Sequence, residues 1–148
     1  MPIPQFTDSG VLPEGIHICT LAELRELFGN FQTSDRRPRL YQKLEAFVLE
    51  ARASGIIKAL VIDGSFVTRE PFPNDIDMVA VLRAHHDFRR ELLPQEYNVV
   101  DRTRVYRTYG LDLFVVEDNS VEYRAVIRFF QRIRLQPTVA KGILRIEL

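Results

Sequence analysis

Apolar residues recur along this chain with different periods, and each period predicts a type of secondary structure. Segments with an apolar residue every three or four positions, the period of a helix with one buried face, are residues 21–28, 38–54 and 121–134. Alternating or continuous apolar runs, the pattern of strands, are residues 59–62, 75–82, 111–116 and 141–148. Residues 1–19 contain prolines and glycines without either period, so we expect an irregular or extended lead-in there.

Residues typical of helix ends frame the predicted helices. Thr20 and Glu23 have the spacing of a capping box, and Gly29 follows the last apolar position of that helix. Pro38 is a favoured first-turn residue for the next helix, and Gly55 is its C-terminal stop. The core stripe predicted for this second helix is Leu40, Leu44, Phe47, Val48 and Ala51. Helices that alternate with strands predict one α/β domain over residues 1–148, with a short mixed sheet flanked by helices. We expect the acidic residues along one edge of this sheet and the helices on the opposite face.

The segments after residue 82 carry weaker patterns. Residues 83–93 predict a short helix that Pro94 ends. The apolar residues of segment 95–109 are compatible with a strand: Val99, Val100, Val105 and Tyr106. Near the end of the chain, Ser120 is a candidate cap for the helix that runs to residue 134. One side of that helix is predicted to be apolar, through Val126, Phe129, Phe130 and Ile133.

Composition narrows the class of protein. A chain of 148 residues with 46% apolar and 27% charged residues is typical of one folded globular domain. The 20 basic and 20 acidic residues cancel, which removes the net-charge argument for non-specific binding to nucleic acid or membranes. Local patches stay possible, so a polynucleotide substrate is neither implied nor excluded.

The cysteine content and the N-terminal pattern indicate a compartment. Cys19 is the only cysteine, which rules out an intramolecular disulfide and a cysteine zinc site and favours a reducing cytoplasm. The chain begins without a basic region followed by an apolar run, and no apolar run is long enough to span a bilayer. We therefore expect a cytoplasmic protein that neither crosses a membrane nor is exported.

Acidic residues open a strand that is otherwise apolar. Side chains alternate across a strand, so Asp75 and Asp77 are predicted to share one face, while Ile76 and Met78 point to the other. Buried carboxylates need compensation, and hard cations such as Mg²⁺ take carboxylate oxygens together with substrate phosphates. The pair therefore predicts a site for phosphoryl or nucleotidyl transfer, although an acidic turn before a strand remains an alternative.

Gly64 and Ser65 end the preceding strand and form a candidate phosphate-binding corner. A residue without Cβ lets a phosphate approach the backbone, and a hydroxyl with nearby N–H groups can bind its oxygens. The sequence thus pairs a predicted cation site with a predicted phosphate site.

These residues resemble the signature of the polymerase-beta-like nucleotidyltransferase superfamily. The shared pattern is a hydrophobic strand, Gly64-Ser65, a variable loop, Asp75-Ile76-Asp77 and a second hydrophobic strand. The superfamily has a third carboxylate on a later apolar strand, which Asp112 supplies here. In particular, the chain is similar to an uncharacterised group of small, stand-alone bacterial proteins of this kind.

The resemblance implies an enzyme that moves a nucleoside monophosphate from a nucleoside triphosphate, such as ATP, to a hydroxyl acceptor on a protein, an RNA or a small molecule. Mg²⁺ or Mn²⁺ would be the cofactor, held by Asp75, Asp77 and Asp112. In this scheme Asp75 and Asp77 bridge both ions, and Asp112 helps to bind the ion that activates the attacking hydroxyl. The arginines of segment 95–109, Arg102, Arg104 and Arg107, are candidates to line the triphosphate path.

The loop after Ser65 differs from that of the antitoxin-like members of the superfamily. It is richer in proline and lacks their Ala-Arg-Gly continuation, and no separate acceptor-binding domain is visible. A catalytically silent binding module is therefore the alternative, such as the antitoxin of a toxin–antitoxin pair or a nucleotide sensor.

Other polar residues of the chain are weaker candidates for a site. His17 has no second ligand at metal-site spacing, and His85 and His86 are adjacent on a predicted helix, so we expect surface histidines, with Asp87 beside them. The cluster Arg36, Arg37 and Arg39 opposes a helix dipole and is either a solvated turn or a residue set with another role. The stripe Arg124, Arg128 and Arg132 is either a solvated face or a surface for an acidic protein or RNA.

Overall fold

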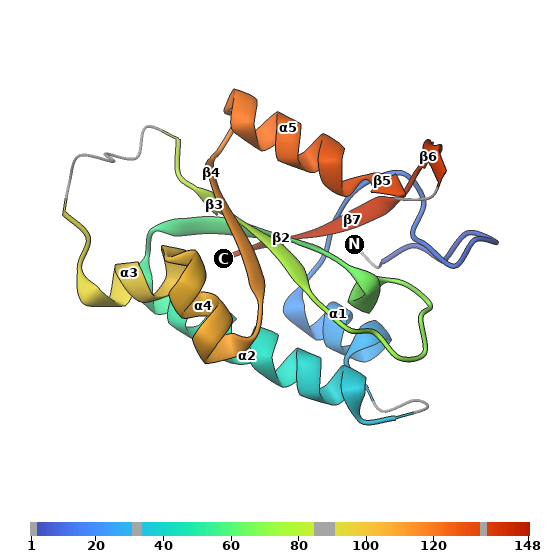
Figure 1. Cartoon of the computed structure of the whole chain (residues 1–148), viewed down its shortest axis with the longest axis horizontal. Helices are drawn as coiled ribbons and strands as arrows, with labels where there is room; N and C mark the ends of the chain where they lie inside the picture. Colours follow the sequence, from blue (N-terminus) through green and yellow to red (C-terminus); the bar gives the residue numbers. More distant parts are fainter. Residues whose placement is uncertain (1–2, 31–33, 85–90, 134–135) are drawn as a thin grey trace.

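The centre of the molecule is a five-stranded mixed sheet with the order β1-β7-β2-β3-β4 (Figure 1). The computed structural model describes residues 3–30, 34–84, 91–133 and 136–148. The strands of the sheet are β1 (Gly15–Ile18), β2 (Ile57–Asp63), β3 (Asp77–Leu82), β4 (Asp112–Glu117) and β7 (Gly142–Glu147). A separate two-stranded ribbon contains β5 (Arg132–Ile133) and β6 (Gln136–Ala140).

Strand directions follow a simple rule across this sheet. The middle strand β2 is antiparallel to both of its neighbours, β3 and β7. The edge strands β1 and β4 run parallel to their neighbours, β7 and β3. A short 3₁₀ turn, η1 (Ser65–Val67), follows β2 and begins the loop to β3.

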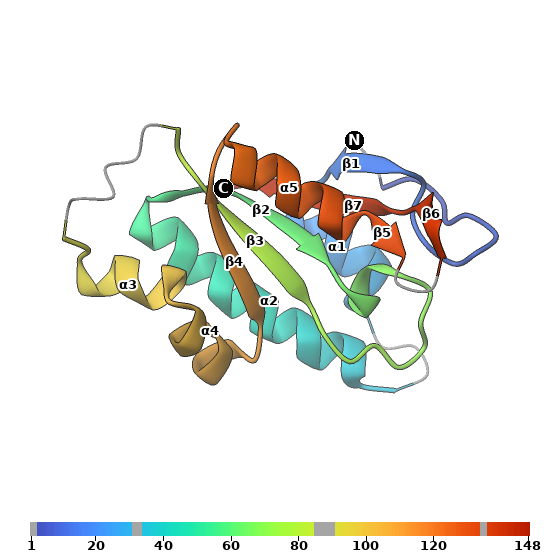
Figure 2. The same cartoon turned by 45° about the horizontal axis from the view of Figure 1, so that its top comes forward.

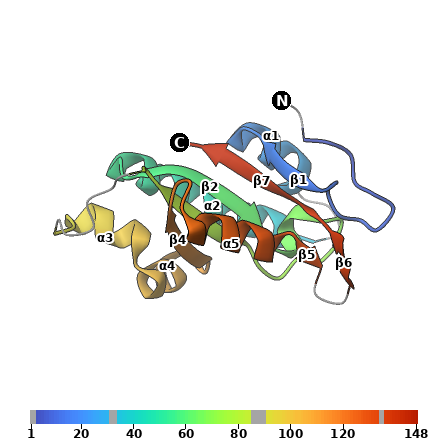
Figure 3. The same ribbon diagram turned by 90° about the horizontal axis from the view of Figure 1, so that it is seen from above.

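Helices cover both faces of the sheet (Figure 2). One face packs on α1 (Leu21–Phe28), α2 (Arg36–Ser54), α3 (Pro94–Val100) and α4 (Arg102–Tyr109). The other face packs on α5 (Val121–Phe130). Figure 3 shows α3 and α4 together on the β4 side of the sheet. The predicted α/β fold is confirmed, but α5 lies on the same face as the acidic side chains, and we had expected helices only on the opposite face.

Burial on both faces explains why the strands read as continuous apolar runs. In β3, Met78 and Ala80 join the core under α1 to α4, whereas Val79 and Val81 join the smaller core under α5. All four side chains are buried. A strand with one solvated face would instead alternate apolar and polar residues.

The first helices match the predictions from their caps. Thr20 Oγ1 accepts from the Glu23 N–H and Glu23 Oε1 accepts from the Thr20 N–H, both at 3.1 Å, which is the predicted capping box at the start of α1. Gly55 ends α2 with a φ of 72°, a left-handed conformation that favours glycine. The predicted core stripe of α2 is buried throughout.

The predicted strand in segment 95–109 is wrong, because this segment forms α3 and α4. Pro94 occupies the first turn of α3 instead of ending a helix, and the Leu93 N–H donates to Glu96 Oε1 at 2.9 Å. Asp101 Oδ1 then caps α4 by accepting from the Arg104 N–H at 2.9 Å. Each short helix buries one valine in the core, Val99 and Val105. Two isolated valines therefore anchor two helices and do not form one strand.

Several other boundaries also differ from expectation. The lead-in contains β1, so it is part of the sheet. Residues 83, 84 and 91–93 are not helical, and the predicted histidine pair with Asp87 lies outside the described residues. The last helix, α5, ends at Phe130, and Phe129 is 63% exposed instead of lying in the core. Arg132 consequently belongs to β5 and does not continue a helical arginine stripe.

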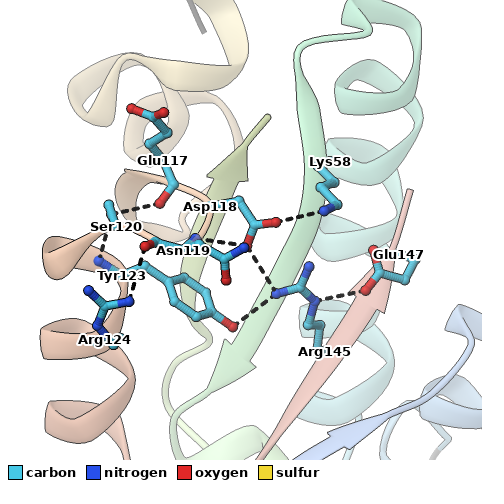
Figure 4. Close-up of polar contacts among 9 residues, drawn as sticks. All are labelled: Lys58, Glu117, Asp118, Asn119, Ser120, Tyr123, Arg124, Arg145 and Glu147. Carbon is cyan, nitrogen blue, oxygen red and sulfur yellow. Dashed lines mark hydrogen bonds and ion pairs between the residues drawn. The ribbon is translucent and has the colours of Figure 1, made fainter. Parts of the chain in front are cut away.

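A polar network ties the start of α5 to the sheet (Figure 4). Asp118 is buried and its Oδ2 lies 2.6 Å from Lys58 Nζ, while its Oδ1 lies 3.8 Å from Arg145 Nη1. Arg145 also donates to the Tyr123 hydroxyl at 2.9 Å, and Ser120 Oγ accepts from the Tyr123 N–H at 3.0 Å. These contacts fix α5 at the end of the sheet where β3 and β4 finish.

No helix in the part of the chain that the structure describes is both long enough and apolar enough to cross a membrane.

Candidate functional site: a row of carboxylates across the sheet

Aspartates lie side by side where β2 ends and where β3 and β4 begin. Asp63 of β2 pairs in register with Asp77 of β3, and Asp77 pairs with Asp112 of β4. Paired residues project from the same face of a sheet, with Cβ atoms about 5 Å apart. We call Asp63, Asp77 and Asp112 the carboxylate row. It lies on the α5 face, because Asp77 alternates with Val79 and Val81.

Asp75 lies next to the row but outside the strand, since β3 begins at Asp77. Its side chain is exposed, and its Oδ1 accepts hydrogen bonds from the Ser65 hydroxyl at 2.8 Å and from the Ser65 N–H at 3.3 Å. The same hydroxyl accepts from the Asn74 N–H at 3.0 Å. The predicted phosphate-binding serine is thus bonded to one of the predicted metal-binding acids.

Gly64 is required by the backbone that surrounds it. Its φ is 95°, and a Cβ added there would lie 3.0 Å from the Asp75 carbonyl oxygen and 3.1 Å from the Asp77 nitrogen. The absence of a side chain at Gly64 therefore lets the start of β3 approach the corner closely. The same close approach brings Ser65 and Asp75 together.

The ends of the carboxylate row are paired with basic side chains. Lys141 Nζ lies 2.9 Å from Asp63 Oδ1, and both side chains are largely buried. Arg102 Nη2 lies 3.0 Å from Asp112 Oδ1, and this pair is half exposed. The Arg102 guanidinium also covers the ring of Phe114, at 5.0 Å from its centroid.

Burial and the other carboxylates of the row raise the pKa of the middle aspartate, Asp77. The pKa of Asp77 is raised to about 6, chiefly by burial and then by the nearby carboxylates Asp75, Asp63 and Asp112, against an opposing effect of Lys141. Burial likewise raises the pKa of Asp63, with Lys141 acting in the opposite direction. Such shifts cluster at functional sites, because a structure without function gains nothing from repelling charges.

The loop between β2 and β3 is held in place from α2. Arg37 is buried and donates to the carbonyl oxygens of Phe66 at 2.6 Å, Thr68 at 2.8 Å and Glu70 at 2.6 Å. Arg36 donates to Asn74 Oδ1 at 2.7 Å. The arginines at the start of α2 thus have a role beyond a solvated turn, because they fix the loop that carries Ser65 and Asp75. Arg39 alone fits the solvated alternative, in an exposed pair with Asp35 at 2.8 Å.

The donor chemistry of the row fits a hard divalent cation, because each member supplies carboxylate oxygens. Among the described residues, however, no group of His, Cys, Asp or Glu side chains is arranged as it stands to hold a metal ion. The contacts explain this: Asp75 faces Ser65, Asp112 faces Arg102 and Asp63 faces Lys141. A cation would have to replace some of these partners. His17 offers no ligand here, since its Nε2–H donates to the Pro13 carbonyl oxygen at 2.7 Å.

Comparison with known proteins identifies the family. A sequence model of one protein family matches residues 4–147, nearly the whole chain. The chain belongs to this family of unknown function (DUF6932). No curated protein and no solved structure matches it. Its DUF6932 description assigns no activity, so function has to be inferred from the carboxylate row itself.

The structure brings together the residues that the sequence singled out for the cation and the phosphate corner: Gly64, Ser65, Asp75, Asp77 and Asp112. Of the arginines predicted for the triphosphate path, Arg102 reaches the row, whereas Arg104 bonds Asn98 away from it. The structure adds Asp63 and Lys141, which sequence reasoning missed. Asp63 is the polar end of an apolar run directly before Gly64, and that position was the available signal. Lys141 had no local signal, because its proximity to Asp63 arises only when β7 pairs with β2.

Proposed function

We propose that this protein is a metal-dependent nucleotidyltransferase that moves a nucleoside monophosphate from a nucleoside triphosphate to a hydroxyl acceptor. The observation that carries the proposal is the carboxylate row, with Asp77 between Asp63 and Asp112 on adjacent strands. The Gly64-Ser65 corner lies against Asp75 and Asp77, where the triphosphate would bind. This combination of acids and corner is what the resemblance to polymerase-beta-like nucleotidyltransferases predicts.

Mg²⁺ or Mn²⁺ would be held by Asp75, Asp77 and Asp112. A bound divalent cation supplies neutralisation of phosphate charge and a lower pKa for the attacking hydroxyl. Asp77, in the middle of the row, would contribute to every ion bound there, and Asp112 to the ion beside the acceptor. Gly64 and Ser65 would hold the phosphates through backbone N–H groups and the hydroxyl.

The transfer itself is an in-line displacement. The acceptor oxygen forms a bond to the α-phosphorus and its proton passes to water. The bond between the α-phosphorus and the oxygen that bridges to the β-phosphate breaks, and pyrophosphate leaves with that electron pair. The residues of the row position the reacting groups and do not form a covalent intermediate.

A binding module without catalysis is the second candidate, and a specific observation favours it. Asp75 and Asp112 already have protein partners, Ser65 and Arg102, so the row is partly neutralised without any ion. Such a module would act as an antitoxin-like protein or as a nucleotide sensor. Its partner, a protein or an RNA, would bind through the exposed side chains of Arg124, Arg128 and Arg132. We propose a cytoplasmic location for either candidate, because the single cysteine, Cys19, is buried and unpaired.

The experiment that separates these candidates is a screen with labelled nucleoside triphosphates, protein, Mg²⁺ and cell lysate, followed by a search for a labelled macromolecule. Nucleotide affinity is measured in parallel by calorimetry, with and without EDTA. Labelling and Mg²⁺-dependent nucleotide binding are expected for the enzyme. Tight nucleotide binding in EDTA, or a stable protein partner without labelling, would favour the module.

Variants in the row test the roles of its members. We expect Asp112→Asn to keep most of the Mg²⁺-nucleotide affinity while losing transfer by orders of magnitude, because this residue serves the ion beside the acceptor. Asp77→Asn should lose both the Mg²⁺-nucleotide affinity and the transfer. Ser65→Ala should weaken nucleotide binding by about 1 to 3 kcal/mol, the range for a hydrogen bond to a charged group. Asp8→Asn, at an exposed position in the lead-in, is the control. Label transfer by Asp112→Asn at the parent rate would remove this residue from the site.

A further inference from the structure

Asp63 has no role in the pattern that predicted the site, yet it is the most buried acid of the row. Its side chain is 5% exposed at the end of β2, directly opposite Asp77. An ionised carboxylate in such a position requires a compensating charge, and Lys141 Nζ at 2.9 Å supplies it. Asp63 Oδ1 is fully buried and has no well-directed hydrogen bond, so its compensation is the charge of Lys141. A ligand can therefore reach this oxygen only in place of Lys141.

Lys141 reaches this position from a distant part of the chain. Its backbone N–H donates to the Gln131 carbonyl oxygen at 2.8 Å, at the junction between the β5–β6 ribbon and β7. Its side chain is 16% exposed, and its positive charge acts on Asp77 as well as on Asp63. The Lys141 ammonium is carried on a flexible side chain, so it can move relative to the row without a change in the backbone.

The other end of the row is arranged in the same way. Arg102 approaches Asp112 from α4 and its guanidinium covers Phe114. Lys141 and Arg102, which we call the flanking cations, thus stand at the β2 end and the β4 end of the row. Between them lies Asp77, which has no salt-bridge partner among the residues that the structure describes, although the charges of Asp63, Asp112 and Lys141 all act on it.

We propose that the flanking cations are exchangeable: each leaves its aspartate when a divalent cation enters the row, and each then binds the triphosphate. Lys141 and a divalent cation cannot both bind the same oxygen of Asp63, and a hard cation binds carboxylate oxygens more strongly than an ammonium does. A triphosphate carries more negative charge than one divalent cation neutralises, so the released ammonium and guanidinium have phosphate oxygens to bind. Because the triphosphate belongs to the proposed function, the phosphate half of this exchange rests on that function.

A permanent structural ion pair would have different surroundings, and the same strand provides one for comparison. Lys58, near the other end of β2, pairs with the buried Asp118 at 2.6 Å. Asp118 is also close to Arg145 and accepts from the Asn119 N–H at 3.1 Å, and its pKa is lowered, chiefly through the hydrogen bond from Lys58. Asp63 has fewer partners, because Lys141 is its one salt-bridge partner among the described residues. The Lys58 pair is therefore part of a larger network, whereas Asp63 depends on Lys141 for its compensating charge.

The parent protein allows a direct test of the exchange. The lysines of the chain are Lys43, Lys58 and Lys141, so reductive methylation with ¹³C gives an NMR spectrum that single substitutions can assign. Addition of Mg²⁺ is expected to shift the Lys141 resonance, and a non-hydrolysable ATP analogue is expected to shift it again. The Lys58 resonance should stay where it is throughout. A Lys141 resonance that does not move while Mg²⁺ binds would overturn the exchange.

Affinity measurements give an independent test, because the exchange predicts that removal of a flanking cation strengthens metal binding and weakens nucleotide binding. Lys141→Met and Arg102→Ala should each bind Mn²⁺ about tenfold more tightly without nucleotide, because the ion no longer displaces a cation. Each should bind the ATP analogue with Mn²⁺ about tenfold more weakly, for loss of a charged hydrogen bond. The matched controls are Lys58→Met and Arg104→Ala, and neither should change either affinity. Arg104 lies on the same helix as Arg102 but bonds Asn98 Oδ1 and covers Tyr97.

The outcomes distinguish this exchange from the proposed function. Suppose that the parent binds Mn²⁺ with the ATP analogue. If Lys141→Met and Arg102→Ala then lose affinity for both Mn²⁺ and the analogue, or for neither, the exchange is wrong and the enzyme proposal stands. If the variants bind Mn²⁺ more tightly but no form binds nucleotide, release by metal is supported and the transferase proposal fails. If the parent binds neither ligand, both fail. Should Lys141→Met not fold, the ¹³C spectrum of the parent still decides.

Discussion

Asp63 and Asp77 face each other directly across the antiparallel ladder of β2 and β3. Like charges in this position repel, and cross-strand pairs of this kind destabilise a sheet. The fold therefore keeps an arrangement that costs stability, which natural proteins retain mainly where function requires it.

The first prediction concerns Asp77. In the folded state its pKa is about 6, above the ordinary value for an aspartate, so the folded state binds more protons than the unfolded state between about pH 4 and pH 6. The contribution of this group to stability therefore falls as pH rises through that window. We expect Asp77→Asn to raise the free energy of unfolding at pH 7.5 in EDTA by about 1 kcal/mol, after allowance for solvent screening of a half-buried group.

Urea denaturation at several pH values measures this effect. The difference between Asp77→Asn and the parent should shrink as the pH is lowered to about 4, where the parent carboxyl is protonated as well. Mg²⁺ should stabilise the parent and leave the variant unchanged. A variant that is less stable than the parent at every pH would show that Asp77 is a structural residue.

A glycine pair gives the second prediction. Gly64 and Gly55 both have positive φ, at 95° and 72°, but an added Cβ meets backbone atoms at Gly64 and open space at Gly55. Gly55→Ala should cost about 1 kcal/mol, the strain of a left-handed alanine. Gly64→Ala should cost about 2 to 3 kcal/mol, because the start of β3 must also move. Equal losses in thermal unfolding would mean that the close approach at Gly64 is unimportant.

The third prediction concerns the buried Arg37. Lysine cannot reproduce the planar set of donors that reaches Phe66, Thr68 and Glu70, so Arg37→Lys should destabilise the fold by about 2 to 4 kcal/mol. Amide hydrogen exchange should accelerate in residues 65–75, with the amides of α5 unaffected. Arg39→Lys, in an exposed ion pair, is the control and should change stability by less than about 0.5 kcal/mol. Unchanged hydrogen exchange in the loop would show that Arg37 does not hold it in place.

The fourth prediction concerns Asp118, which has a lowered pKa, chiefly through the hydrogen bond from Lys58. A lowered carboxyl pKa adds stability above the unfolded pKa, and this stability is lost as pH falls through the folded value. Asp118→Asn should therefore reduce the free energy of unfolding by about 2 kcal/mol at pH 7, with a smaller difference below about pH 4. Asp35→Asn, in an exposed pair, should have little effect. A loss that is constant with pH would assign the effect to packing and not to charge.

Local signals in the sequence were sufficient for much of this fold. Thr20 and Gly55 fix helix ends through bonds or backbone angles that involve only nearby residues, so their spacing alone predicted α1 and α2. The apolar runs of β2 and β3 were equally clear because these strands are buried on both faces, and β4 kept an apolar run although it is an edge strand and only partly buried. In α3 and α4 only Val99 and Val105 lie in the core, and so little apolar periodicity could not distinguish short helices from a strand.

The candidate site was predictable to the extent that its residues lie near each other in the chain. Gly64, Ser65, Asp75 and Asp77 belong to one loop and its flanking strands, and that spacing was informative. The partners Lys141 and Arg102 depend on how β7 and α4 pack against the row. No period in the sequence encodes such pairings, so the charge balance of the row became visible only in the structure.

The position of β7 also has a consequence for the order in which the molecule can assemble. Among the described strands, β1 pairs with β7 alone, in a register that joins Gly15 to Gly142. β1 thus has no place in the sheet until β7 has been synthesised. Pairing over such a sequence separation is slow, since loop closure precedes any gain from contacts. During synthesis Asp63 also lacks its lysine, so the acids of a nascent chain stand together without Lys141 until translation reaches residue 141.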